Sequence, residues 1–129
     1  MKTSETFGAF AGGLIGGALV DFIFITFVGP SALFSLIGIT ERWAVFSAHC
    51  LLGSLLGVIF IIFFYKLLEK VNIWVKGFLW GMVCMILFGG IPAFFYYPFF
   101  PGPIIILSGF LVWSILGLMI VLGIKASKK

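Results

Sequence analysis

Four long apolar segments make up most of this sequence, separated by short stretches that carry charge, proline or glycine. They cover about residues 7–28, 43–65, 73–88 and 104–124. Crossing a membrane as a helix takes roughly 20 apolar residues, and a backbone in lipid must satisfy its own hydrogen bonds. The third segment is the shortest unless it continues into Gly89–Gly90. The pattern predicts an all-α integral membrane four-helix bundle, formed as a single transmembrane domain over residues 1–129.

The composition supports this prediction, and the positions of the charges add an orientation. The chain is 63% hydrophobic and 9% charged, whereas a soluble domain has about 25% charged residues. With four spans, both termini and the 66–76 loop share one side, which holds seven lysines against Arg42 on the other. Basic residues favour the cytoplasmic side, so we expect both termini in the cytoplasm of a cell inner membrane. The net charge of +4 is a topology signal and predicts no nucleic-acid partner.

Small residues recur every four positions in three of the segments, which places each series on one helix face. Such stripes let helix backbones pack closely in lipid. The predicted helix-packing residues are Gly13, Gly17, Gly53, Gly57, Gly77 and Gly81.

Asp21 and His49 extend two of these stripes in a mirrored way, as Gly13–Gly17–Asp21 and His49–Gly53–Gly57. In an antiparallel pair, Asp21 faces His49, Gly17 faces Gly53 and Gly13 faces Gly57. Asp21 precedes Gly29 by eight residues and His49 follows Glu41 by eight, so both lie about 12 Å inside their helices. Because an ionisable group in a membrane is costly and usually paired, we expect contact between the two side chains, directly or through water.

The sequence leaves the role of this candidate intramembrane polar pair open. It is a structural hydrogen bond that fixes helix register, a proton relay, or a polar site for a ligand entering from the outer face. A haem ligated by two histidines needs a second histidine, and the chain has one. Cys50 and Cys84 form no CxxC motif, and two cysteines alone make no metal site. We therefore expect no metal or cofactor and no catalytic residue.

The connecting segments carry three further expectations. Residues 30–40 are mostly apolar and are expected to lie in the membrane interface, with a short helix as one form. Glu41 and Arg42 are expected to pair with each other, with solvent or with lipid head groups. The short 66–76 loop makes the second and third helices antiparallel neighbours.

The segment 89–103 is uncharged and rich in proline, which disfavours a regular helix. Since water would solvate it poorly, we expect it to contact lipid, the bundle or a partner protein. Its aromatic residues form the candidate partner or lipid surface: Phe94, Phe95, Tyr96, Tyr97, Phe99 and Phe100.

The stretch from Ala48 to Gly123 resembles the YagU-like group of small membrane proteins. The resemblance rests on His49-x-x-x-Gly53, on the start Ile73-Trp74-Val75-Lys76-Gly77, and on Leu111-Val112-Trp113 after a proline-rich loop. Phe7–Pro30 is similar to the glycine-rich first helix of that group. The resemblance implies a four-helix inner-membrane protein and indicates little about activity.

Two functions fit these observations. The first is a non-enzymatic accessory or structural subunit that contacts the lipid bilayer and other membrane subunits. The alternative is an oligomeric small transporter or channel that uses Asp21 and His49 for proton or ion coupling.

The orientation is testable by cysteine labelling in intact cells. A cysteine placed at Ser127, near the C-terminus, should be protected from a membrane-impermeant maleimide, because the lysine distribution places this end in the cytoplasm. Labelling should appear once the membrane is permeabilised. Labelling of intact cells at position 127 would show that the orientation is reversed.

Overall fold

The computed structural model describes residues 3–27, 32–67, 69–96 and 103–128, and every regular element in them is helical. In chain order these are α1 (Thr3–Phe27), α2 (Ala32–Leu36), α3 (Arg42–Ile59), the π-helix η1 (Phe60–Phe64), α4 (Tyr65–Leu67), α5 (Ile73–Cys84), the π-helix η2 (Met85–Gly90), α6 (Ile91–Tyr96) and α7 (Pro103–Ser127).

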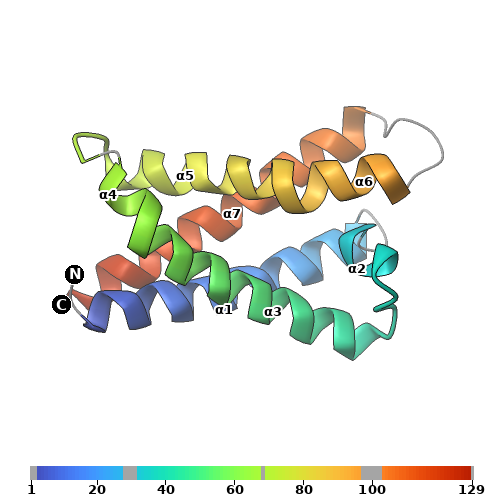
Figure 1. The fold of residues 1–129 in the computed structure, drawn as a ribbon, viewed down its shortest axis with the longest axis horizontal. Helices are drawn as coiled ribbons and strands as arrows, with labels where there is room; N and C mark the ends of the chain where they lie inside the picture. Colours follow the sequence, from blue (N-terminus) through green and yellow to red (C-terminus); the bar gives the residue numbers. More distant parts are fainter. Residues whose placement is uncertain (1–2, 28–31, 68, 97–102, 129) are drawn as a thin grey trace.

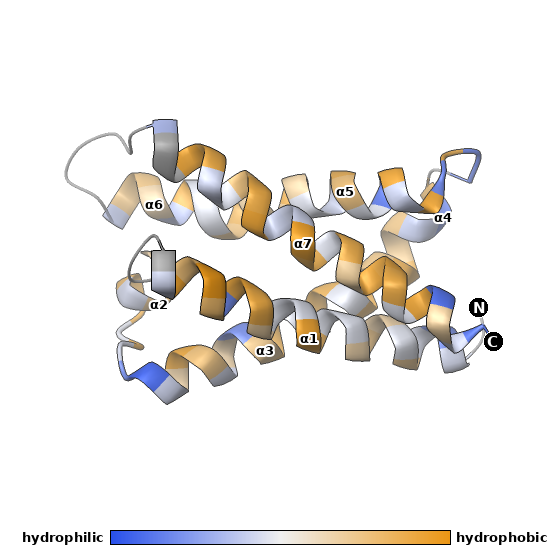
Figure 2. Ribbon diagram, turned by 180° about the vertical axis from the view of Figure 1, so that it is seen from behind, coloured by the Kyte–Doolittle hydropathy of each residue, from blue (hydrophilic) through white to orange (hydrophobic). Residues whose placement is uncertain are grey.

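Four spans are long and apolar enough to cross a membrane: Thr3–Thr26, Arg42–Leu67, Ile73–Tyr96 and Ile106–Ser127. The predicted all-α bundle of four membrane helices is therefore confirmed, and the protein is a multi-pass membrane protein. Both termini and the loop after α4 lie at one end of the bundle, while α2 and α6 lie at the other (Figure 1). The most hydrophilic segments gather mainly at these two ends (Figure 2).

The helix α1 packs along both α3 and α7, and α7 in turn packs along α5. The spans therefore follow the order α3, α1, α7, α5. The second and third spans contact each other mainly through η1, where Phe60 and Phe64 meet Trp80. Beyond that point they diverge (Figure 1). The expectation that a short loop makes them neighbours is thus met only near the loop, because α5 packs on α7 instead.

The contact between α1 and α3 is a contact of backbones. A Cβ atom added at Gly13 would collide with the carbonyl of Gly53, and one at Gly17 with the carbonyl of His49. A Cβ at Gly53 would lie 3.0 Å from the Cα of Gly17, and one at Gly57 would lie 3.6 Å from the Cα of Gly13. The two glycine stripes therefore interleave close to the register that their spacing predicts.

The other face of α1 packs on α7 by the same means. Added Cβ atoms at Gly8 and Gly12 would collide with the carbonyls of Gly123 and Met119. On the far side of α7, a Cβ at Gly81 would approach the carbonyl of Trp113 to 2.5 Å. All three contacts between long helices thus depend on glycine. The glycines at these two interfaces with α7 include Gly8, Gly12, Gly16, Gly77, Gly81, Gly117 and Gly123.

The third span runs through η2 and α6 to Tyr96, well beyond the predicted end at Phe88. The expectation that proline prevents a regular helix after Gly89 is wrong for residues 91–96. Proline lacks an N–H and breaks a standard i to i−4 ladder. Here the ladder has already shifted, because the N–H of Ile91 donates to the carbonyl of Ile86 in the π-helix before Pro92. Tyr97, Phe99 and Phe100 lie outside the described residues.

The short helix α2 matches the form expected for the 30–40 segment, although it packs on the bundle. Ala32 and Phe34 are both buried. After α2 the chain turns at Gly38, whose φ of 84° is the left-handed conformation that glycine adopts readily. This turn leads the chain back toward the start of α3.

The glycine contacts predict a sharp difference between two alanine substitutions. Gly53→Ala should lower the free energy of unfolding by about 1–3 kcal/mol, because its Cβ meets the rigid backbone of α1. Gly90→Ala should be neutral or slightly stabilising, since its Cβ has only the Met85 carbonyl nearby, at 3.5 Å. Thermal unfolding in mild detergent measures both. Equal losses from the two variants would contradict this packing.

Candidate functional site

Asp21 and His49 are in direct contact inside the bundle. The Oδ1 atom of Asp21 lies 2.8 Å from Nδ1 of His49. The Asp21 side chain has no exposed surface, and the His49 side chain is 5% exposed. The contact expected from the mirrored spacing is therefore present. Its cause is the close α1–α3 packing, since Gly17 rests against the backbone of His49 itself.

Arg42 is a third member of this site that the sequence analysis did not place there. Its guanidinium Nη1 lies 2.8 Å from Oδ2 of Asp21 in an ion pair. The expectation that Arg42 pairs with Glu41, solvent or lipid is incomplete, because its inner end binds a buried carboxylate while 42% of the side chain stays exposed. The seven-residue spacing of Arg42 and His49 places both on one face of α3. That spacing was the available signal.

Glu41 sets the position of Arg42 by fixing where α3 begins. Its Oε2 atom accepts a hydrogen bond of 2.7 Å from the N–H of Ala44, so Glu41 caps the helix. The backbone N–H groups of Trp43 and Ala44 hold the pKa of Glu41 below its usual value. The cap is therefore charged at neutral pH, and Arg42 becomes the first residue of the helix.

The three side chains form a closed electrostatic unit. An ionised carboxylate only accepts hydrogen bonds, so Nδ1 of His49 carries the proton that is donated to Asp21. The arginine charge offsets the charge of Asp21. The ring of Phe34, from α2, covers the imidazole edge to face at a centroid distance of 4.7 Å. Burial of Asp21 is thus tolerated because a cation and a hydrogen-bond donor flank its carboxylate.

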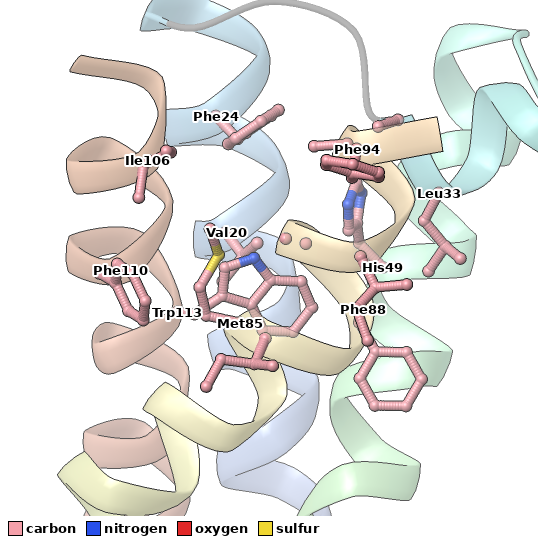
Figure 3. A pocket seen from close by; sticks show the side chains of 16 residues that line it. Val20, Phe24, Leu33, His49, Met85, Phe88, Phe94, Ile106, Phe110 and Trp113 are labelled. Atoms are coloured by element: carbon pink, nitrogen blue, oxygen red, sulfur yellow. The ribbon is translucent and has the colours of Figure 1, made fainter. Parts of the chain in front are cut away.

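His49 also lines a cavity of about 330 Å³ at the α2/α6 end of the bundle. This volume is at the lower end of the range for ligand pockets, about 300–1,000 Å³. Its wall comes from α1, α2, α3, η2, α6 and α7. Figure 3 shows Phe24, Phe88, Phe94, Phe110 and Trp113 among the side chains around it. The cavity occupies the space that opens where α3 and α5 diverge and where α2 packs on α6.

The lysines that signalled topology make specific contacts at the other end. Lys76 is 4% exposed, and its Nζ donates a hydrogen bond of 2.8 Å to the backbone carbonyl of Tyr65. The same Nζ lies over the aromatic ring of Tyr65. Lys128 donates to the Tyr65 hydroxyl, a bond that raises the pKa of the lysine, and lies 3.7 Å from Glu5. Lys125 lies over Trp74. This end therefore has lysines joined to aromatic rings, as expected at a membrane interface.

The predicted packing glycines and the predicted aromatic surface differ in how near they lie to the polar unit. Gly13, Gly17, Gly53 and Gly57 support it from below, whereas Gly77 and Gly81 serve the α5–α7 contact. Phe94, Phe95 and Tyr96 are 62%, 72% and 38% exposed at the end of the third span. Within the described residues, no group of three or more histidine, cysteine or acidic side chains could hold a metal.

No protein-family model matches the chain, and neither the curated proteins nor the solved structures include a match. The resemblance to the YagU-like group stays a prediction.

A double-mutant cycle tests the ion pair. Arg42→Gln should lower the free energy of unfolding by about 2–3 kcal/mol, because the buried Asp21 charge then has only the neutral His49 side chain as a partner. The double variant Asp21→Asn/Arg42→Gln should be more stable than Arg42→Gln, since no charged side chain then remains at this site. Chemical or thermal unfolding in detergent gives both values. The single variant Asp21→Asn completes the cycle. If the loss in the double variant equals the sum of the losses from Asp21→Asn and Arg42→Gln, the pair is not coupled.

Proposed function

We propose that this protein is a non-enzymatic accessory subunit of a larger assembly in the cytoplasmic (inner) membrane, with both termini in the cytoplasm. The observation that carries the proposal is that a smaller share of the third span is buried inside the bundle than of the other three spans. Over its most apolar window, 28% of the residues of Ile73–Tyr96 are buried, against 44% in each of the other three spans.

Both the second and the third span lie at an edge of the bundle, and the third has the less extensive contact with its neighbour. Of the long helices, α7 is the one that packs extensively on α5. The opposite face carries Phe78, Leu87 and Ile91, which are 42%, 51% and 47% exposed, and it ends at Phe94 and Phe95. Aromatic residues are the side chains most often found at the energetic centres of protein interfaces. This face therefore offers a continuous surface for an apolar helix of another subunit.

The glycine stripes also support a partner that binds at the third span. Stripes of this kind often join separate membrane chains, but here they face helices of the same chain. A partner must then use another surface. The exposed face of the third span is a large apolar surface that these glycine contacts leave free.

The non-enzymatic part of the proposal is supported by the state of Asp21. Both carboxylate oxygens lie against a partner, His49 or Arg42, and the side chain is fully buried. A general base must reach a proton on a substrate. Asp21 serves instead as the centre of a structural polar unit.

The transport alternative is favoured by one observation. The polar unit runs from the buried Asp21 to Arg42, which is 42% exposed, so ionisable groups connect the interior of the bundle with its α2/α6 end. A chain of this size needs at least a second copy to enclose a path across the membrane. The homo-oligomer and the hetero-oligomer therefore make different predictions about what contacts the third span.

Site-specific photo-crosslinking separates these cases. The benzophenone amino acid p-benzoylphenylalanine placed at Leu87 of η2, on the exposed face of the third span, should yield a discrete adduct with a different membrane protein in the cells that naturally make this chain. The control position is Leu55 on α3, which has a similar exposure, 57% against 51%. Leu55 should give lipid adducts.

Lipid adducts at both positions would contradict the accessory-subunit proposal. An adduct between two copies of this chain at Leu87 would favour the oligomeric transporter instead. Mass spectrometry of the excised bands identifies the adducts in each case.

A further inference from the structure

The cavity beside His49 presents a second polar group besides the imidazole. Trp113 lines the cavity and is 5% exposed. Among the residues that the structure describes, no hydrogen bond involves its indole N–H. An added Cβ at Gly89 would come within 3.0 Å of that nitrogen. The same added Cβ would lie 2.6 Å from Sδ of Met85, so Gly89, the Met85 thioether and the indole nitrogen lie together in the wall of the cavity.

The imidazole supplies a matching acceptor. Its Nδ1–H donates to Asp21, and Arg42 already balances the carboxylate charge. A second proton on the ring would place a net positive charge next to an apolar cavity, so Nε2 keeps its lone pair. Figure 3 shows the His49 and Trp113 rings among the side chains that surround the space. One acceptor and one donor thus line the same cavity.

The remaining wall favours a ring over a flexible chain. Phe88 and Trp113 stack at a centroid distance of 6.4 Å with planes 24° apart, which gives the cavity a flat aromatic side. A hydrocarbon chain would fill the volume but leave both nitrogen atoms without partners. A hydroxyl group can donate to Nε2 and accept from an indole N–H.

The cavity reaches the surface that faces the membrane. Ile86, Ile91 and Phe94 line it and are 51%, 47% and 62% exposed on the outside of the third span. A ligand can therefore enter from the bilayer, with an apolar tail remaining in lipid.

From these observations we infer that the cavity binds a lipid-soluble molecule with a hydroxylated aromatic ring, a phenol or quinol bearing an apolar tail. The ring lies against Phe88 and Trp113, and its hydroxyl groups bond to His49 and Trp113. Every group that forms the site comes from this chain. Ile91 and Phe94 at its opening also belong to the face proposed for a partner helix, so the purified chain without a partner is the form that tests the site.

The experiment uses the purified full chain in detergent and two probes that differ in their hydroxyl groups. Decyl-1,4-hydroquinone, kept anaerobic, and its dimethyl ether are titrated, and the rise in melting temperature gives an apparent Kd for each. The hydroquinone should bind saturably and at least about tenfold more tightly than the ether, since the ether cannot donate to Nε2. Equal binding of the two probes, or no saturable binding, would overturn the inference.

Two tryptophan variants locate the site. Trp113→Phe should weaken hydroquinone binding by about five- to tenfold, because it removes the donor and keeps an aromatic ring. Trp80→Phe is the matched control, since Trp80 is also buried and its Nε1 also has no partner in the described chain, yet it lies outside the cavity. The affinity of the Trp80→Phe variant for the hydroquinone should equal that of the natural chain. Equal effects of the two variants would refute the placement, and if Trp113→Phe does not fold, the probe comparison on the natural chain still decides.

Discussion

Direct backbone contact between α1 and two other helices is the constraint on which the rest of this structure depends. Glycines on both faces of α1 allow α3 and α7 to approach until carbonyl groups meet Cα atoms. Packing of this kind replaces the hydrophobic effect, which provides no net attraction between helices in lipid. With α1 held on both sides, α5 packs on α7. The exposed third span and the gap between α3 and α5 both follow from this order.

The buried carboxylate is a consequence of the same contact. Asp21 continues the α1 stripe that packs on α3, so the glycine register brings it against His49. A lone carboxylate at this depth would be costly in hydrocarbon. Arg42, the first residue of α3, offsets this cost. Its long side chain reaches inward to the carboxylate while part of it remains at the surface. The protein thus obtains a polar centre in which the charges of Asp21 and Arg42 balance.

The cavity and the polar unit share His49, which connects structure to the proposed ligand. One ring nitrogen serves the fold through Asp21, and the same side chain lines the cavity. The helix η2 contributes to the same wall, and π-helical segments often occur at functional sites. In this chain η2 lets the third span continue past Pro92 to Tyr96. This extension places Phe94 in the wall of the cavity.

The sequence by itself determined the four spans, their helical state and the pairing of Asp21 with His49. These follow from local rules, since span length, hydropathy and four-residue spacing act along one or two helices. It did not determine the neighbours of α5 and α7, because a short loop fixes only the ends that it joins. Only the tertiary structure brought Arg42 to Asp21 and set Trp113 beside an open space. Both results depend on how helices far apart in the chain diverge, and that is decided by packing of the whole bundle.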